Sequence, residues 1–511
     1  MMTETELKLR IAPRDVPRLQ RHPLLRELAR GPAAIQKLYS IYYDTPAREL
    51  WRNGIALRLR RVGRGWVQTL KFGGGAAAGL HQRQELEAPV ARQQLDFTKL
   101  VAPGVTTLFD RPEVRDALAP AFATRVRRVV RMLETAAGER IEFSLDRGEI
   151  VAGGAREPLC EVELELKAGN PVGLFRIARR LAEDCAAKAE HSSKAERGFA
   201  LLIGRGPVKA APAEFAPDAA AGTAFAAVVS ACLDHLQANE RGVLEGADAE
   251  YLHQMRVALR RLRSALRVFA PLAAGEAAAA LGAELKWLTG KRGPARDWDV
   301  FALETLPGLV AEFPDHAGLQ ELAAGAAARR RAANRAARAA LASSRYQALL
   351  LGFGEWLAGS AAPDARRTAR ETRKDGPALH PGRRYAAEVL ARDHERVRKR
   401  GRHLEQQSAG QLHRLRIAIK KLRYAGDFFS ALYDRKSVKP YLVRLAELQQ
   451  VLGVINDVAT TQQLLATLPQ SGVLQRETHG IIMGWSASTR ARQLELLGPA
   501  WRDFRRAKPF W

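Results

Sequence analysis

The sequence has little cysteine and no long uncharged apolar run. Its cysteines, Cys160, Cys185 and Cys232, are far apart among 511 residues, so they form neither a CxxC pair nor an even disulfide set. The sequence has no run of about 18 uncharged apolar residues, the length that a membrane-spanning helix needs. It also does not open with the basic segment and apolar run that are typical of a signal peptide. These absences exclude a disulfide-rich secreted domain and predict a cytoplasmic protein with no membrane contact.

Negative charge is also scarce relative to positive charge. The chain has 81 Lys and Arg residues against 55 Asp and Glu residues, a net charge of +26, and the excess is present in both halves. Hydrophobic residues make up 47% of the chain, which excludes disorder as the reason for the high charge. A folded protein this basic is expected to bind polyanions.

The length predicts two or three domains, and the residue pattern changes along the chain. Residues 1–205 combine strand-like runs with turn signals such as Asn53-Gly54. Residues 206–222 are rich in Ala and Pro without apolar periodicity, which predicts a linker. Residues 223–507 are rich in Ala, Leu and Arg with three- and four-residue periodicity, which predicts an all-α domain.

Charged residues stand at every second position in several stretches of the first part. These stretches are 4–8, 58–60, 83–87, 142–146 and 161–167. Period two places them on one face of each strand. A solvent-exposed strand face is the simpler interpretation of any one stretch, but repeated blocks of both signs favour strands that close with their charged faces inward. The expected fold class is therefore α+β, with an N-terminal antiparallel β tunnel barrel followed by the all-α domain.

The helical part contains an internal repeat. The segment from His253 to Arg263 matches the segment from His413 to Arg423, an offset of 160 residues, and the match continues to Asp297 and Asp457. A repeat of this length predicts two similar helical bundles.

Each repeat carries basic residues on one helical face, which we call the basic stripes. The first stripe consists of His253, Arg256, Arg260, Arg263 and Arg267, and the second of His413, Arg416, Lys420 and Arg423. Like charges at this spacing repel by about 0.2–0.5 kcal/mol per pair, so an anionic ligand that neutralises them is expected. A solvated surface helix is the alternative. The stripes lack interleaved aromatic residues for base stacking, which argues against nucleic acid and favours a flexible phosphate chain.

Residues 223–507 resemble the CHAD (conserved histidine α-helical) family. The resemblance is carried by the basic stripes and by two presumed turns, Gly293-Pro-Ala-Arg296-Asp297 and Gly453-Val-Ile-Asn456-Asp457. It implies two helical bundles whose basic faces bind long-chain inorganic polyphosphate. We expect Asp297 and Asp457 to cap helices or to hold arginine side chains.

Residues 1–203 resemble the CYTH family of triphosphate tunnel metalloenzymes. The motifs that carry this resemblance are Glu4-x-Glu6-x-Lys8, Tyr42-Tyr43-Asp44-Thr45, Leu57-Arg58-x-Arg60, Arg83-x-Glu85-x-Glu87, Asp146-x-Gly148, Glu161-x-Glu163-x-Glu165 and the segment from Lys188 through Ser193-Lys194 to Gly198. Tyr42 and Tyr43 are compatible with barrel packing as well as with substrate contact.

The resemblance implies roles for the charged residues. The metal, Mg²⁺ or Mn²⁺, would be held by Glu4, Glu6, Glu163 and Glu165. Triphosphate would be bound by Arg58, Arg60, Lys71, Arg83, Arg128, Lys188 and Lys194. The catalytic group would comprise Glu4, Glu6 and Lys8, together with Glu85 and Glu87, which orient water. Arg125, Arg127, Arg128 and Arg131 all compete for one position in the tunnel, and we favour Arg128.

The combined resemblance is to fused CYTH–CHAD tunnel enzymes. It implies an enzyme that hydrolyses inorganic triphosphate to pyrophosphate and phosphate with a divalent metal, while its helical domain binds polyphosphate. The alternatives are a tunnel enzyme for thiamine or nucleoside triphosphates, a non-catalytic polyphosphate-binding protein, and a nucleic-acid-binding protein. The paired glutamates argue against a purely binding role, because carboxylates repel phosphate unless a metal lies between them.

Overall fold

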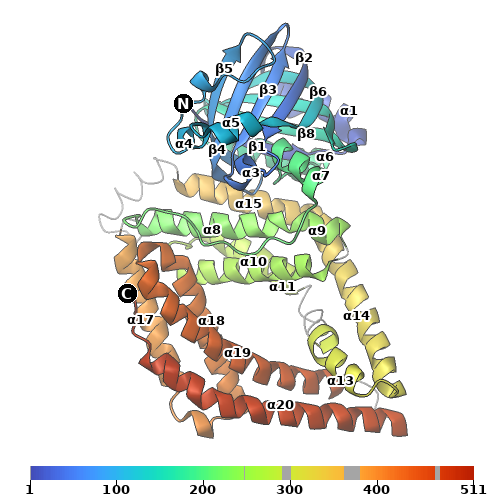
Figure 1. The fold of residues 1–511 in the computed structure, drawn as a ribbon, viewed down its shortest axis with the longest axis vertical. Coiled ribbons are helices and arrows are strands. Elements are labelled where there is room, and N and C mark those ends of the chain that lie inside the picture. The colour runs from blue at the N-terminus through green and yellow to red at the C-terminus, as the bar shows by residue number, and fades with distance from the viewer. Residues whose placement is uncertain (1, 247, 291–297, 299–300, 362–379, 467–471) are drawn as a thin grey trace. The chain divides into compact units, whose positions relative to one another are not determined.

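The structure is a computed structural model that describes the chain except residues 1, 247, 291–297, 299–300, 362–379 and 467–471 (Figure 1). Its residues form two compact units that do not follow chain order. The first unit comprises Met1–Lys209, Leu233–Met255 and Ser343–Thr368, and the second comprises Ala210–Cys232, Arg256–Ala342 and Ala369–Trp511. Segments of the predicted helical domain therefore pack with the N-terminal part.

Antiparallel strands form a closed barrel in the first unit. Their order is β5-β4-β3-β2-β6-β7-β8-β1-β9, and an additional pairing of β1 with β5 closes the ring. The strands are β1 (Met2–Arg10), β2 (Ala29–Asp44), β3 (Ala56–Val62), β4 (Gly65–Ala77), β5 (Leu80–Val90), β6 (Ala119–Glu134), β7 (Arg140–Ala152), β8 (Ala155–Ala168) and β9 (Lys188–Ala189). This confirms the predicted antiparallel barrel.

The barrel has its apolar side chains outside and its charged side chains inside. Leu7 and Leu9 of β1 are fully buried in a core that includes Phe175 and Leu181 of helix α6 (Val172–Cys185). Because side chains alternate along a strand, Glu6 and Lys8 then face the interior. Charged and apolar residues alternate along β1 because one face of the strand lines the cavity and the other packs against a helix.

This unit also contains short helices. They are α1 (Val16–Gln20), α2 (Pro23–Glu27), α3 (Glu49–Arg52), α4 (Thr106–Phe109), α5 (Pro112–Ala117) and α7 (Lys194–Ile203). Helix α7 begins with a capping box in which Ser193 accepts from the backbone N–H of Glu196 and the Glu196 carboxylate accepts from the N–H of Ser193. This cap fixes Lys194 at the first helical position.

Beyond residue 220 the described chain is mostly helical. Its helices are α8 (Ala221–Ala238), α9 (Glu240–Glu245), α10 (Ala249–Val268), α11 (Glu276–Gly290), α13 (Leu306–Glu312), α14 (Ala317–Ala342), α15 (Ser344–Ala361), α17 (Gly382–Arg400), α18 (Ala409–Phe429), α19 (Arg435–Ala466) and α20 (Val473–Arg506). Helices α10 and α18 begin 160 residues apart, as the sequence repeat predicts. In the described part of the chain we find no helix that combines the length and apolarity of a membrane span.

Corresponding residues of the two repeats meet in the second unit. The ring centroids of Phe269 and Phe429, which are related by the 160-residue offset, lie 5.2 Å apart. In a second corresponding pair, Phe225 packs against Phe269, and Tyr385 packs against both Phe269 and Phe429. The two repeats therefore share one aromatic core around an approximate two-fold relation.

The presumed turns of the repeat have different outcomes. The segment Gly453–Asp457 lies inside helix α19, so the predicted turn is wrong. Glycine in a helix interior costs only about 1 kcal/mol, which the buried positions Leu448, Leu452 and Ile455 on the same helix outweigh. The segment Gly293–Asp297 lies outside the described residues.

Candidate active site

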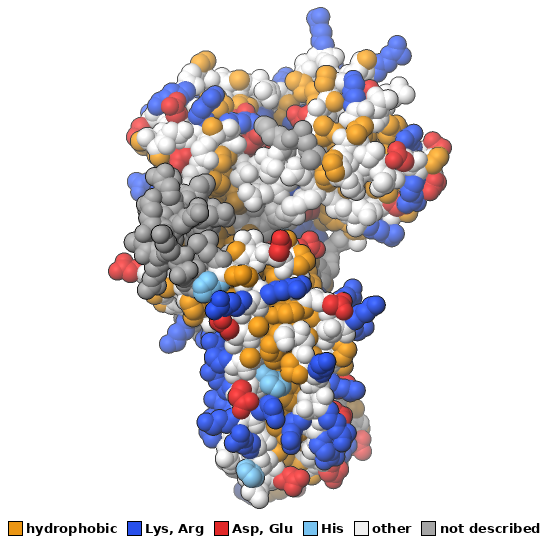
Figure 2. Space-filling model, turned by 90° about the vertical axis from the view of Figure 1, so that its left-hand side faces the viewer, with side chains coloured by type: hydrophobic (Ala, Val, Ile, Leu, Met, Phe, Trp, Pro, Cys, Tyr) orange, Lys and Arg blue, Asp and Glu red, His pale blue; other side chains and the backbone are white. Residues whose placement is uncertain are grey.

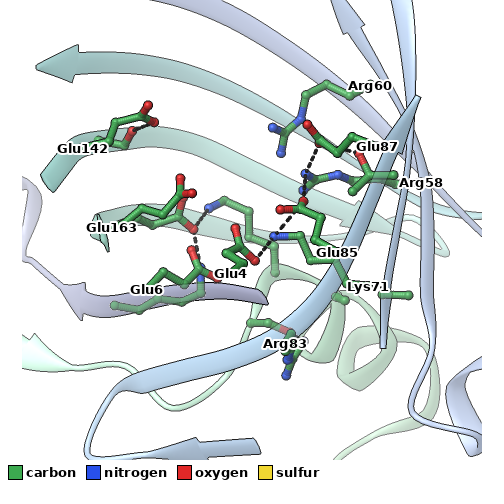
Figure 3. A pocket seen from close by; sticks show the side chains of 18 of the residues that line it. Glu4, Glu6, Arg58, Arg60, Lys71, Arg83, Glu85, Glu87, Glu142 and Glu163 are labelled. Atoms are coloured by element: carbon green, nitrogen blue, oxygen red, sulfur yellow. Dashed lines mark hydrogen bonds and ion pairs between the residues drawn. The ribbon is translucent and has the colours of Figure 1, made fainter. Parts of the chain in front are cut away.

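The barrel encloses a polar cavity of about 340 Å³ (Figure 3). Residues from many strands of the ring line it, which follows from their inward-facing positions. Among the residues predicted from the sequence, the cavity is lined by Glu4, Glu6, Lys8, Arg58, Arg60, Lys71, Arg83, Glu85, Glu87, Arg128, Glu163, Glu165 and Lys194. Lys188 lies on β9, beyond the cavity wall, where its backbone pairs with Arg10.

Carboxylates gather on one side of the cavity, on β1, β7 and β8. Strand register places Glu6 opposite Glu165 and Glu165 opposite Glu142, so these side chains are neighbours across the sheet. Burial and the nearby Glu6 raise the pKa of Glu4, and burial also raises the pKa of Glu165. Burial is the main cause of both shifts, and a bound cation would favour the ionised form of these carboxylates.

The opposite side is basic. Figure 3 shows Arg58 and Arg60 across the cavity from Glu6 and Glu163. Burial and the adjacent Arg58 and Arg128 lower the pKa of Arg60 to about 10. The Arg58 guanidinium lies 3.8 Å from Glu85 and 3.7 Å from Glu87. These two carboxylates compensate only part of the positive charge of the arginines on this side. An anion would find uncompensated arginines here.

Ion pairs bridge the two sides near β1. Lys71 donates to Glu4 and lies 3.2 Å from Glu85. Although burial disfavours a charged Glu6, the Lys8 ammonium at 2.9 Å lowers the pKa of Glu6 to about 2. Glu6 is therefore a permanent carboxylate in the cavity.

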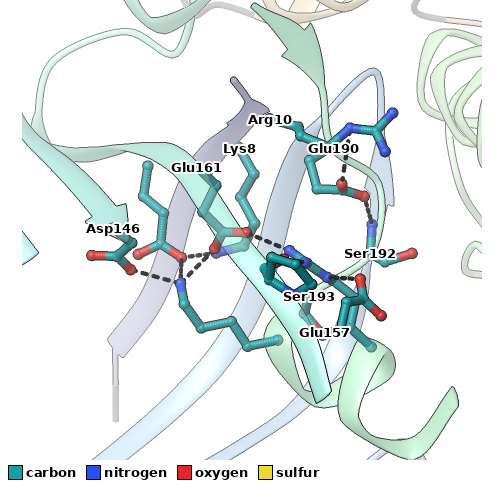
Figure 4. Close-up of polar contacts among 12 residues, drawn as sticks. Lys8, Arg10, Asp146, Glu157, Glu161, Glu190, Ser192 and Ser193 are labelled. Atoms are coloured by element: carbon teal, nitrogen blue, oxygen red, sulfur yellow. Dashed lines mark hydrogen bonds and ion pairs between the residues drawn. The ribbon is translucent and has the colours of Figure 1, made fainter. Parts of the chain in front are cut away.

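A dense ion-pair cluster closes one end of the cavity (Figure 4). Carboxylate oxygens of Asp146, Glu161 and Glu163 lie within 4.8 Å of one another. The Lys194 ammonium contacts all of them, at 2.8 Å from Asp146, 2.5 Å from Glu161 and 2.8 Å from Glu163. Arg128 adds a bidentate contact to Asp146 at 2.7 Å. Each carboxylate of this cluster has at least two cationic partners. Among the described residues, the row formed by Glu4, Glu6, Glu142 and Glu165 has one partner for each carboxylate, with Lys167 shared by the last two, so the row is better suited to a metal.

Two family models match the chain. The CYTH domain model matches residues 2–199, and the CHAD domain model matches residues 227–466. The chain carries a CYTH domain followed by a CHAD domain. The tunnel cavity described above lies within the CYTH domain.

Similar proteins support both assignments. The inorganic triphosphatase of Haemophilus influenzae is 31% identical over 207 residues, which is 39% of this chain and 55% of that protein. An uncharacterized protein of Mycobacterium tuberculosis is 30% identical over 341 residues, 62% of each chain. The crystal structure of the CHAD domain from the plant Ricinus communis is 35% identical, with a TM-score of 0.51, and covers 60% of this chain and 99% of that domain. The matches to these curated relatives thus span between about half and two thirds of the relatives' length.

The CYTH cavity also includes residues to which the sequence interpretation gave no role. Glu142 and Lys167 line it, and Asp146 belongs to the ion-pair cluster beside it. Glu161, which the sequence placed in an acidic row with Glu163 and Glu165, also belongs to that cluster. The period-two alternation of residues 142–146 and 161–167 was the signal for these side chains. It gives the inward face of each strand but not the partner of each residue.

The four arginines considered for the tunnel, Arg125, Arg127, Arg128 and Arg131, all lie on β6. Arg128 lines the cavity, whereas Arg125 is exposed and pairs with Glu149 at 3.5 Å. Tyr42 lines the cavity and also stacks on Phe122, with ring centroids 4.4 Å apart, so its contribution to packing is established.

The basic stripes of the CHAD domain lie on α10 and α18. Asp457 holds an arginine as expected, with its carboxylate 3.9 Å from Arg416, and His413 contacts Asn456 at 2.6 Å. Arg267 lies 3.3 Å from the buried Asp393. Several stripe residues therefore have fixed partners within the fold. The stripes also contain His253, Arg256, Arg260, Arg263, Lys420 and Arg423.

Proposed function

We propose that the chain is a metal-dependent inorganic triphosphatase that hydrolyses tripolyphosphate to pyrophosphate and phosphate. The observation that carries the proposal is the division of one enclosed cavity into a carboxylate row and an arginine wall. A metal-bound triphosphate has the matching distribution of charge, because the metal suits the carboxylates and the phosphate oxygens suit the arginines.

The residues would share the reaction as follows. Arg58, Arg60 and Arg128 would bind phosphate oxygens, with Lys8, Lys71, Arg83 and Lys194 completing the positive lining. Glu4, Glu6 and Glu165, with Glu142 beside them, would hold Mg²⁺ or Mn²⁺, while Glu163 is engaged mainly with Lys8 and Lys194. The bound metal would neutralise phosphate charge and polarise the phosphorus–oxygen bonds.

Water would be the nucleophile, because positioning and charge neutralisation suffice for phosphoryl transfer. Although burial opposes ionisation of Glu87, nearby Arg58 lowers its pKa, and Thr69 donates to it at 2.8 Å. Glu87 therefore stays a carboxylate that can accept a hydrogen bond from water, and Glu85 lies beside it. Both would orient water toward the terminal phosphorus.

An inorganic substrate is favoured over a nucleotide. Among the described residues that line the cavity, Tyr42 is the one aromatic, and its ring already stacks on Phe122. A base entering the cavity would find no free aromatic face.

The CHAD domain would bind long-chain polyphosphate through its basic stripes. The chain as a whole is basic, with a net charge of +26, and Figure 2 shows Lys and Arg side chains over much of the lower part of the view. A flexible phosphate chain can follow such a surface, since it requires charge and not base recognition.

The test is phosphate release from tripolyphosphate, ATP and thiamine triphosphate with Mg²⁺ or Mn²⁺. We expect the Glu4→Gln/Glu6→Gln variant to lose tripolyphosphate turnover by at least about a hundredfold, since it removes metal ligands. The matched control is Glu149→Gln, which changes an outward-facing carboxylate of the same barrel. If the wild type hydrolyses no substrate with either metal, the proposal fails.

A further inference from the structure

A continuous chain of ion pairs leads from helix α9 into the tunnel. It starts at Arg241, whose guanidinium lies 2.8 Å from Glu157 at the start of β8. Glu157 also contacts Arg197 of α7 at 2.8 Å, and Arg197 contacts Glu161 at 3.0 Å. Figure 4 shows Glu157 on one side of these contacts and Glu161 and Asp146 on the other. Glu161 then contacts Lys194, which lines the cavity.

The ion-paired residues between Arg241 and the cavity are buried. The exposed fraction is 9% for Glu157, 4% for Arg197, 0% for Glu161 and 7% for Lys194. Ion pairs interact more strongly where water is excluded, so loss of one member changes the charge balance of the next.

In this series of ion pairs, Glu157 is the residue that contacts both Arg197 and Arg241. Arg197 and Arg241 both donate to the same oxygen, Oε1 of Glu157. Without Arg241, the Glu157 carboxylate would attract Arg197 more strongly and draw it away from Glu161. Glu161 would then depend on Lys194 alone, which would hold the Lys194 ammonium deeper in the carboxylate cluster and away from a substrate phosphate.

Two buried glutamines from the helices of this unit accept hydrogen bonds from the barrel backbone. Gln237 of α8 accepts from the backbone N–H of Ala78 at 2.7 Å, and Gln347 of α15 accepts from that of Ala189 at 3.0 Å. Their neighbours Gly79 and Glu190 bond to the backbone of Lys8. The backbone segments that bond to Lys8 are thus held by residues that follow the CYTH domain in sequence, and Arg241, which also follows it, joins the ion pairs that lead to Lys194.

We propose that Arg241 is a positioning residue of the tunnel, which sets Lys194 for triphosphate through Glu157, Arg197 and Glu161. The proposal rests on the proposed function, since it assumes that triphosphate enters this cavity. It makes the start of the CHAD region part of the tunnel's binding apparatus.

The test compares Arg241→Ala, Arg241→Lys and Arg179→Ala in the full chain. Arg179 of α6 pairs with Glu355 of α15 at 2.6 Å, so its loss removes an ion pair of the same unit that has no connection to Lys194. The Kd for tripolyphosphate is measured by calorimetry in EDTA, the KM and kcat with Mg²⁺ or Mn²⁺, and the melting temperature for each variant.

For Arg241→Ala we expect the Kd and KM for tripolyphosphate to rise by roughly tenfold, a size that mutations along such networks reach, with kcat changed by less than about twofold. Arg241→Lys should restore part of the affinity because it keeps the positive charge. Arg179→Ala should leave Kd and KM unchanged, whatever its effect on the melting temperature.

The proposal is overturned if Arg241→Ala binds as the wild type does, or if Arg179→Ala weakens binding equally, since that would indicate general loosening. Binding without turnover by the wild type would refute the proposed triphosphatase while the Kd series still decides the role of Arg241. If the wild type neither binds nor hydrolyses tripolyphosphate, both proposals fail.

Discussion

At the scale of single residues, Arg128 forms ion pairs with two carboxylates inside the barrel. It balances Asp146, which is completely buried, and also donates to Glu163. We predict that Arg128→Ala lowers the free energy of unfolding by about 3 kcal/mol, because it leaves a buried carboxylate short of a partner. The control is Arg125→Ala on the same strand, an exposed change expected to stay within about 0.5 kcal/mol in urea denaturation. Equal stability of the two variants would contradict this role of Arg128.

Glu240 gives a pH-dependent prediction. It is buried, it accepts from the Tyr346 hydroxyl at 3.0 Å, and burial raises its pKa from 4.5 to about 7. Between these values the folded protein keeps a proton that the unfolded chain loses, so the stability contributed by protonated Glu240 falls as pH rises from about 4.5 to 7.

Glu240→Gln removes this titration and keeps an acceptor for Tyr346. Relative to the wild type, the variant should gain about 2 to 3 kcal/mol in free energy of unfolding between pH 5 and pH 8, from about 1.4 kcal/mol per pKa unit. Urea denaturation at the two pH values measures the difference. A wild-type-to-variant difference that does not change with pH would show that Glu240 ionises normally.

At the scale of elements, the capping box of α7 links helix stability to the site. Ser193 lines the cavity and also contacts Arg83, so its hydroxyl serves both the helix start and the tunnel wall. We predict that Ser193→Ala lowers stability by about 1 kcal/mol and also raises the KM for tripolyphosphate, because Lys194 follows the cap directly. Ser408→Ala removes a similar capping box, at α18, and should lower stability alone. A KM equal to that of the wild type would separate the cap from the site.

The elements also show what the sequence can and cannot predict. Alternation placed Glu6, Lys8 and Glu163 on inward faces correctly, since a strand has a fixed period of two. The turn expected at Gly453–Asp457 is wrong, because the buried apolar positions of α19 continue through it and outweigh the glycine. Local pattern determines the face of an element, whereas tertiary packing decides where the element ends.

At the scale of the whole molecule, the main gap in the sequence interpretation concerns which segments pack together. Leu233–Met255 and Ser343–Thr368 join the unit that contains residues 1–209, although their residue pattern matches the helical part. The contact of Arg241 with Glu157 spans 84 residues, and that of Gln347 with Ala189 spans 158. Nothing in the local period of either segment indicates such a partner, so these contacts required the fold.

The basic stripes can be tested as a shared surface of the two repeats. Arg263 and Arg423 occupy corresponding positions, and neither forms an ion pair with a described carboxylate at contact distance. The double variant Arg263→Ala/Arg423→Ala should bind long-chain polyphosphate more weakly, and the slope of log affinity against log salt should shrink by about 2, one for each lost phosphate contact. The control, Arg384→Ala/Arg444→Ala, removes the same charge from exposed ion pairs with Glu388 and Glu447. Affinity measured by titration at several NaCl concentrations distinguishes the two. Equal losses of affinity in both double variants would mean that polyphosphate binding depends on net charge and not on the stripes. A localised site would instead lose more affinity when Arg263 and Arg423 are removed than when other arginines are.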